Sequence, residues 1–349
     1  MAVRDKSVQI IISAEVASAL RAFDSAGKAI HKFSVQTEQI GRAIDGVFSP
    51  LMRGLTTAVT AIGAGMGKLA KSALTVGGDF EITMKRVAGV IGDAEGSFDA
   101  LTEKAKKMGE ELPITATEAA DAMLLLAQAG KKTNDILSIV DDTTALAISQ
   151  NYGLAETTEL VVSTMSMFGL EAKDSERIVD NFTNACNNSA LTMEKFSNGM
   201  SYVGEIAQSF GLSLEETTGM LALLSRSGLE GEKMATSLRT ILINLRDPTA
   251  KASAAFKELG ISLTDASGQM KPPVQLLREL AAAGMSVDQA IQIFDHRAIG
   301  AGLNLSKFVN ELGGMVKTMW DTGTTTDRLN KLLDTFENRT KEIASAWEG

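Results

Sequence analysis

Residues 213–228 read SLEETTGMLALLSRSG, and this stretch carries the signals that decide the fold of the chain. Ser213 and Glu216 have the spacing of a capping box, in which two side chains satisfy the free N–H groups at the start of a helix. Gly228 closes the stretch, where glycine adopts the left-handed backbone of a helix end at low cost. The stretch therefore predicts a helix with both of its ends encoded.

The same start and stop signals recur along the chain. Thr115 with Glu118, and Ser286 with Gln289, repeat the capping-box spacing. Three further glycines follow apolar stretches where helix ends are expected: Gly130, Gly169 and Gly211. We therefore expect many helices of about 10–20 residues joined by short turns.

Apolar residues between Pro113 and Pro248 recur at helical spacing, without the two-residue alternation of a strand. Proline inside a helix costs about 3 kcal/mol, so this long stretch without proline permits several helices. Three apolar stripes follow the pattern: Ala119, Ala122, Met123 and Leu126; Phe196, Met200, Val203, Ala207 and Phe210; and Met234, Leu238, Ile241, Leu242 and Leu245. The sixteen methionines are expected mainly to fill the core.

The predicted fold class is all-α, a compact multi-helix core flanked by extended amphipathic helices, with one small β-hairpin. The hairpin is expected where residues 261–263 and 269–270 flank a turn that contains Gly268. A weak internal similarity links residues 150–154 (QNYGL) to residues 208–212 (QSFGL). Repeated use of one type of helix turn explains it better than duplication of a larger unit.

The chain divides into three predicted parts. Residues 1–77 hold an amphipathic segment and a Gly-rich apolar run, both expected to be helical. Residues 78–305 form the helical core domain. Residues 306–349 are expected to form an extended C-terminal helix, with one apolar face made of Leu329, Leu332, Leu333 and Phe336.

Composition excludes several classes of protein. The chain has 349 residues, a net charge of −9 and a single cysteine, so an internal disulfide framework is excluded. The two histidines and Cys186 lie too far apart in sequence for a zinc cluster. The acidic balance argues against broad nucleic-acid binding. No cleavable signal peptide is expected, and the most apolar run, residues 54–67, is shorter than the about 20 residues of a membrane span.

Residues 63–68 (GAGMGK) superficially resemble a phosphate-binding loop. Ile62 precedes this run and Leu69 follows Lys68, so the Walker pattern is not met. Gly63 and Gly67 instead have the spacing that lets two helices approach closely, which favours packing in an oligomer. Membrane contact and a flexible connector are the alternatives.

Other candidate chemistry is weak. Adjacent carboxylates occur at Asp141–Asp142, Glu110–Glu111 and Glu215–Glu216, but neighbouring residues on a helix point in different directions, so solvated faces or charges at a helix N-terminus are expected. Cys186 lies on one apolar stripe with Val179 and Phe182 and is expected to be a small buried hydrophobe. His296 is expected to be a surface or capping residue. We therefore predict no catalytic, cofactor-binding or metal-binding residues.

A set of residues in residues 78–305 shares its order and spacing with a known family. They are Asp79, Phe80, Glu81, Met84, Val87, Leu101, residues 126–130, residues 168–170, Asp180, Ala207, Gly211, Gly228, Gly231, residues 237–239, Leu245, Asp247, Pro248, residues 259–261, Asp265, Gly268, Phe294, Arg297 and Ala298. This region, about 230 residues long, resembles the core region of phage tail tape-measure proteins. Two positions depart from the family pattern. Pro113–Ile114 replaces a polar–aromatic approach to a helix cap, and Asp295 stands where the family often has glycine.

The resemblance implies a structural protein of the virion tail without enzymatic activity or cofactors. Such proteins lie in the tail tube lumen or at the tail tip, template tail assembly and length, and leave ahead of the DNA at ejection. Implied partners are further copies of the chain (a trimer or hexamer), tail-tip or baseplate proteins, the tail tube protein and, at ejection, the host membrane. The host cytoplasm is the implied location during assembly, and no specific nucleic-acid binding is implied.

Two other functions stay open. Residues 51–77 could insert into a bilayer, which would make the chain a membrane-active helical protein that aids genome passage. A tail-associated wall hydrolase is the second alternative, although no nucleophile–histidine pair supports it. Length is a constraint on the ruler role, because even a wholly helical chain would span only about 520 Å.

Overall fold

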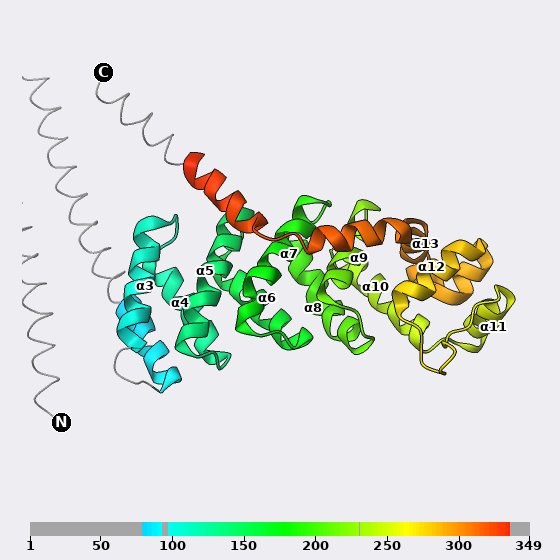
Figure 1. Ribbon diagram of the computed structural model, residues 1–349, viewed down its shortest axis with the longest axis horizontal. Coiled ribbons are helices and arrows are strands. Elements are labelled where there is room, and N and C mark those ends of the chain that lie inside the picture. The colour runs from blue at the N-terminus through cyan, green and yellow to red at the C-terminus, as the bar shows by residue number, and fades with distance from the viewer. Residues whose placement is uncertain (1–78, 93–96, 230, 336–349) are drawn as a thin grey trace, which may run out of the picture. The chain divides into compact units, whose positions relative to one another are not determined.

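The computed structural model describes residues 79–92, 97–229 and 231–335 (Figure 1). The chain divides into two units, Met1–Asp79 and Phe80–Gly349, and the described residues belong almost entirely to the second unit. The predicted N-terminal part, residues 1–77, therefore lies outside the described residues. The three-part division of the chain stays a prediction.

The described residues are helical and form no sheet, which confirms the all-α prediction. Helices also cover residues 79–91 and 324–335. The remaining elements, in chain order, are α3 (Ser97–Glu111), α4 (Ala116–Gln128), α5 (Thr133–Gln150), α6 (Leu154–Phe168), the 3-10 turn η1 (Ala172–Asp174), α7 (Ser175–Asn187), α8 (Met193–Ser209), α9 (Leu214–Arg226), α10 (Gly231–Arg246), α11 (Ala250–Glu258), α12 (Pro273–Ala283) and α13 (Val287–Met319).

Helices α3 to α10 form two rows. In the even row, α4, α6, α8 and α10 pack side by side, and in the odd row α3, α5, α7 and α9 do the same. Consecutive helices connect the rows, so each step of two helices adds one layer, as in helical repeat proteins (Figure 1). Such an array buries its apolar side chains between neighbouring layers.

The predicted local signals are present. All three capping boxes form, at Thr115, Ser213 and Ser286. The four predicted helix-ending glycines all have positive φ: Gly130, Gly169, Gly211 and Gly228. At Gly211 the two closing bonds of a Schellman motif are made, from Leu212 N–H to the Ala207 carbonyl (3.0 Å) and from Gly211 N–H to the Gln208 carbonyl (2.9 Å).

The internal similarity between residues 150–154 and 208–212 reflects shared turn chemistry. In the first segment the left-handed residue is Asn151 (φ 50°), and Gly153 is the N-cap of α6. In the second segment Gly211 is left-handed. The first turn leads from the odd row to the even row and the second leads back, so the two segments are not equivalent parts of one repeating unit.

The predicted β-hairpin is wrong. Residues 261–270 contain one isolated antiparallel bridge, between Thr264 and Met270, and no strand. Gly268 has the expected positive φ of 82°. Two backbone bonds flank the bridge, from Asp265 N–H to the Gln269 carbonyl (2.8 Å) and from Lys271 N–H to the Leu263 carbonyl (2.9 Å). The ladder extends no further because Pro272 and Pro273 have no N–H group and Ile261 N–H donates to the Phe256 carbonyl (2.9 Å).

The three predicted stripes form the core. Every member is buried except Phe210, which packs against the core from its edge. The rings of Phe182 and Phe196 meet with their centroids 4.7 Å apart between α7 and α8. Five methionines of α4 to α10 are at most 1% exposed, as expected for core-filling side chains: Met123, Met165, Met200, Met220 and Met234.

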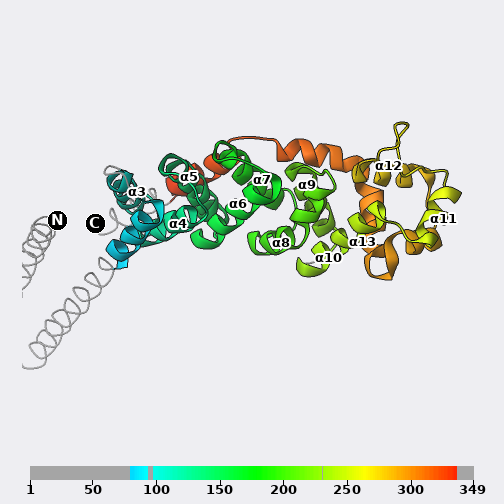
Figure 2. The same cartoon turned by 90° about the horizontal axis from the view of Figure 1, so that it is seen from below.

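Helix α13 returns along the array. It starts beside α11 and α12 and then packs on α10, α9 and α7, so the chain runs back over the odd row (Figures 1 and 2). The predicted boundary at residue 305 falls within α13, whose buried face continues through Leu305, Val309 and Leu312. No helix in the described part of the chain has both the length and the apolar composition to cross a bilayer.

A sharp bend at Asp295 interrupts α13. Asp295 has φ 67° and ψ 157°, a backbone region that glycine adopts and other residues populate only under strain. The bend folds the buried Phe294 ring against Gly302, where an added Cβ would lie 2.4 Å from ring carbons. Asp295 is also one of the two positions at which the sequence departs from the family pattern.

Replacing Asp295 with glycine should therefore stabilise the chain. We expect Asp295→Gly to raise the free energy of unfolding by about 1 kcal/mol, measured by urea denaturation, because the strain at positive φ is relieved. Asp288→Gly, in the helical first turn of α13, is the matched control and should lower it by about 1 kcal/mol. Equal effects of the two substitutions would contradict the assignment of strain to Asp295.

Candidate functional site

Helix α7 has two buried faces of opposite character. One face is apolar and packs into the core through Ile178, Val179 and Phe182. The other carries buried polar side chains: Asp180, Asn181, Thr183 and Asn184. Buried polar groups are costly unless they are hydrogen-bonded, so this second face must have a partner.

The partner is the chain segment that follows α13. Asp180 accepts hydrogen bonds from Gly323 N–H (2.6 Å), Thr325 N–H (2.9 Å) and the Thr324 hydroxyl (3.2 Å). These groups lie at the start of the helix over residues 324–335, where unpaired N–H groups and the helix dipole favour a negative charge. Asp180 therefore caps this helix from another part of the chain.

Neighbouring side chains of α7 bind main-chain groups of the same segment and of the last residue of α13. Asn184 Nδ2 donates to the Asp321 carbonyl (2.9 Å), and Asn181 Nδ2 donates to the Met319 carbonyl (3.4 Å). The hydroxyls of Thr183 and Thr325 are 2.8 Å apart. We call the face formed by Asp180, Asn181, Thr183 and Asn184 the polar seat.

Arg328 extends the contact to the next helix of the odd row. Its Nε donates to the Ser149 carbonyl near the end of α5 (2.7 Å), and its Nη1 donates to the side-chain oxygen of Asn187 at the end of α7. A cation near two helix C-termini is favourable because carbonyl groups there lack partners. The segment thus joins two helices of the array.

An ion pair lies beside the polar seat. Arg177 Nε is 3.5 Å from Glu215 Oε1 of α9, and only 1% of the Glu215 side chain is exposed. The Arg177 guanidinium also lies 4.8 Å from the centre of the Trp320 ring. Arg177 therefore compensates a buried carboxylate and holds the first aromatic residue after α13.

Asp142 forms a second polar contact between α5 and α7. Its carboxylate accepts the Ser175 hydroxyl. Burial raises the pKa of Asp142 to about 6, the serine hydrogen bond opposes the shift, and the nearby Glu176, Asp141 and Asp180 charges add to it. Of the adjacent carboxylates considered in the sequence, Asp142 and Glu215 are the two that face inward.

The other sequence candidates are dispersed. Cys186 is largely buried with its Sγ 3.6 Å from Met193 Sδ, and burial raises the pKa of its thiol to about 12, so it has the character expected of a core side chain. His296 lies exposed at the bend of α13. Residues 63–68 lie outside the described residues. Within the described ranges no group of three or more His, Cys, Asp or Glu side chains could hold a metal ion.

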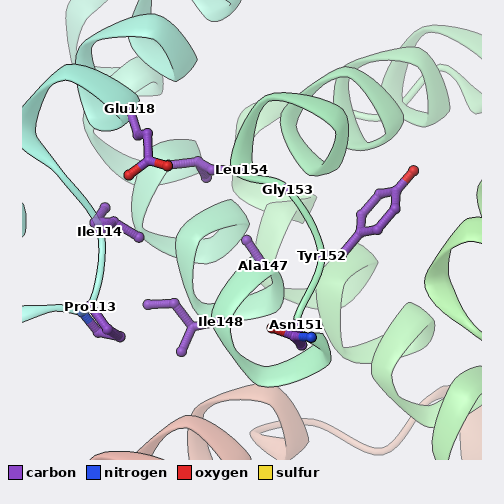
Figure 3. A pocket seen from close by; sticks show the side chains of 9 residues that line it. All are labelled: Pro113, Ile114, Glu118, Ala147, Ile148, Asn151, Tyr152, Gly153 and Leu154. Atoms are coloured by element: carbon purple, nitrogen blue, oxygen red, sulfur yellow. The ribbon is translucent and has the colours of Figure 1, made fainter.

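An open hollow of about 480 Å³ lies between the α3–α4 connection and the α5–α6 turn (Figure 3). Pro113 and Ile114 line one side and Ile148 lines the other. The carboxylate of Glu118 at its rim already accepts Thr115 N–H at 2.7 Å, because it belongs to a capping box. The hollow contains the Pro113–Ile114 departure from the family pattern, and its lining brings together no set of catalytic groups.

Sequence reasoning missed the polar seat. Asp180 was identified only through a family resemblance, and the asparagines and threonine beside it were not considered. The available signal was the composition of α7, in which the face opposite the apolar stripe carries short Asp, Asn and Thr side chains, the types that bind main-chain groups.

The Asp142 contact predicts a pH dependence. The folded-state pKa of about 6 exceeds the ordinary 3.8, so protonation of Asp142 stabilises the fold fully below about pH 3.8, and this stabilisation is lost as the pH rises through 6. Asparagine stays neutral and can still accept from Ser175. The free energy of unfolding of Asp142→Asn, relative to the parent, should therefore increase between pH 4 and pH 7.5 in urea titrations.

Asp141→Asn is the matched control for Asp142→Asn. It removes the same charge from the neighbouring position, where the carboxylate is half-exposed and lies 2.6 Å from Lys104 Nζ. At pH 7.5 it should lower stability slightly, because a favourable ion pair is lost. A stabilising effect of equal size at both positions would contradict the role of burial at Asp142.

Removing Arg177 should be strongly destabilising. Arg177→Ala leaves the Glu215 carboxylate buried without a cation, and we expect the free energy of unfolding to fall by about 3 kcal/mol in urea denaturation. Lys173→Ala removes a cation from the exposed Lys173–Glu171 pair nearby and should leave stability nearly unchanged. Equal effects of the two substitutions would show that the Arg177–Glu215 pair is no more than a surface contact.

Comparison with known proteins places the array in a family. A family model described as phage-related minor tail protein matches residues 102–296, which run from α3 to the bend of α13. A tape measure protein of Pneumococcus phage Dp-1 is 32% identical over 258 residues, 73% of this chain and 22% of the relative. A probable tape measure protein of Escherichia phage P2 is 26% identical over 280 residues, 78% of this chain and 33% of the relative.

The chain thus aligns with no more than a third of the length of either relative. No solved structure matches it. The family model nevertheless covers more than half of the chain, and both relatives carry the tape measure name. The chain therefore belongs to the phage tail tape-measure family.

Proposed function

We propose that this chain is a structural component of a phage tail and acts as a tape-measure protein without enzymatic activity. The observation that carries the proposal is the similarity, over 73% and 78% of the chain, to two proteins named as tape measure proteins. In this role the chain occupies the tail tube lumen or tail tip, templates assembly and length of the tube, and leaves ahead of the DNA. Its partners are further copies of itself, the tube protein and tail-tip proteins.

The geometry of the array indicates which parts of such a protein can measure length. From the start of α5 at Thr133 to the start of α7 at Ser175 the chain uses 42 positions for one layer. Packed helices lie about 8–10 Å apart, so the folded array advances by about 0.2 Å per residue. A single extended helix advances by 1.5 Å per residue.

The array is therefore suited to anchoring, and single helices are suited to measuring. The helix over residues 324–335 extends away from the polar seat, and none of its described side chains after Thr325 is buried. The length of such a segment can change without disturbing a core. The hypothesis of membrane insertion concerns residues 51–77, which lie outside the described residues.

The proposal predicts a change of tail length. We expect an insertion of 72 residues of continuous helix after residue 335, made in the phage gene, to lengthen the tail by about 110 Å in negative-stain electron micrographs. A flexible Gly/Ser insertion of the same number of residues spans only about 50 Å on average and should lengthen the tail less. Phage tails of unchanged length with both insertions would contradict a length-setting role.

A further inference from the structure

Apolar anchoring of the C-terminal part of the chain stops at Met319. The face of α13 is buried up to this residue through Val309, Leu312 and Met315. From residue 320 to residue 335, the described chain has one buried side chain, the polar Thr325. Leu329, Leu332 and Leu333 are only half-buried. Hydrogen bonds, with little apolar burial, therefore hold this segment in place.

The surface that receives this segment is polar as well. Asp180, Thr183 and Asn184 bind it through a carboxylate, a hydroxyl and an amide, and the Asn181 amide beside them binds the Met319 carbonyl at the end of α13. Such side chains exchange protein partners for water at small net cost, whereas an apolar face of the same size would be costly to expose. Exposure of the polar seat leaves the apolar face of α7 in the core.

The connection between α13 and the segment can act as a hinge. Trp320, the C-cap residue directly after α13, is 49% exposed, and Gly323 has a φ of 77°, a conformation that glycine adopts easily. Residues 321 and 322 are exposed and belong to no helix. Rotation at these residues would move the following helix without breaking α13.

We propose that residues 320–335 form a strap that undocks from α7 as a unit while the helical array stays folded. In the docked state Asp180 caps the helix of the strap and Arg328 joins it to α5. In the undocked state water replaces these partners, and the chain after Met319 is free to leave the odd row. The chain after α13 therefore has two states, one with the strap docked on α7 and one with the strap released. This inference does not depend on the tail-length role.

Local opening of this kind is visible in hydrogen exchange of the purified chain. Segments that are held by few apolar contacts open with less free energy than the core and expose little surface, so their exchange is nearly independent of low urea concentrations. We expect the amides of residues 321–328 to exchange at least about tenfold faster than those of α8 and α9. Exchange of the strap at the rate and urea dependence of α9 would overturn the proposal.

Asp180→Ala should increase the exchange of the strap by a further tenfold or more, because the hydrogen bonds from Gly323, Thr324 and Thr325 to its carboxyl group are lost. The urea midpoint of the array, followed by far-UV circular dichroism, should stay unchanged. Glu176→Ala, which removes an exposed carboxylate of the same helix, is the matched control: it should leave the exchange of the strap unchanged and shift the midpoint only slightly, through its weak repulsion of Asp142. A fall of the midpoint in step with faster strap exchange would show that strap and array are one cooperative unit, and would overturn the proposal.

A disulfide staple tests the same motion without weakening any contact. The Thr183 and Thr325 hydroxyls are 2.8 Å apart, so cysteines at these two positions, in a Cys186→Ala background, are placed to bond in the docked state. Oxidation should slow exchange of the strap by about tenfold or more, and reduction should restore it. Identical exchange in the oxidised and reduced forms, with the disulfide verified by mass, would contradict undocking.

Discussion

Burial of apolar stripes between two rows of helices is the constraint on which the rest of the structure depends. No helix of about 13–18 residues is stable alone in water, so each must cover its stripe with neighbours in its own row and in the other row. In the even row, α4, α6, α8 and α10 cover one another's apolar stripes. In the odd row, α13 covers the outer face of the last helix, α9. Helix α7 is the exception, because its outer face is polar and receives polar partners.

Local features of this fold were predictable from the sequence because their causes are local. Capping boxes at Thr115, Ser213 and Ser286 depend on residues three positions apart, and the three stripes depend on a period of 3.6 residues. The hairpin prediction failed because the turn around Gly268 forms but its flanks cannot extend a ladder: Pro272 and Pro273 have no N–H group, and Ile261 N–H binds the Phe256 carbonyl. The prediction was therefore right about the turn at Gly268 and wrong about the two strands beside it.

The polar seat was not predictable in the same way. Its contacts join positions 137 to 145 residues apart, so no window along the chain contains both partners. Asp180 alone is a common helix residue, and its meaning appears only when α13 brings Gly323 and Thr325 beside it. Likewise, Asp141 and Asp142 are the same residue type at adjacent positions. Only the packing of α5 on α7 determines that Asp142 is partly buried and Asp141 is exposed.

The bends of the chain at Asp295 and at Gly323 differ in how they limit motion. At Asp295 the bend is enforced by close packing, because the Phe294 ring occupies the space that a side chain at position 302 would need, and strain is kept in place by a buried aromatic residue. At Gly323 the bend is held by hydrogen bonds on a surface that water can solvate. Packing tolerates few alternative arrangements, whereas hydrogen bonds can be exchanged with water at small net cost. The first bend therefore fixes α13 on the array, and the second leaves the direction of the chain beyond Met319 adjustable.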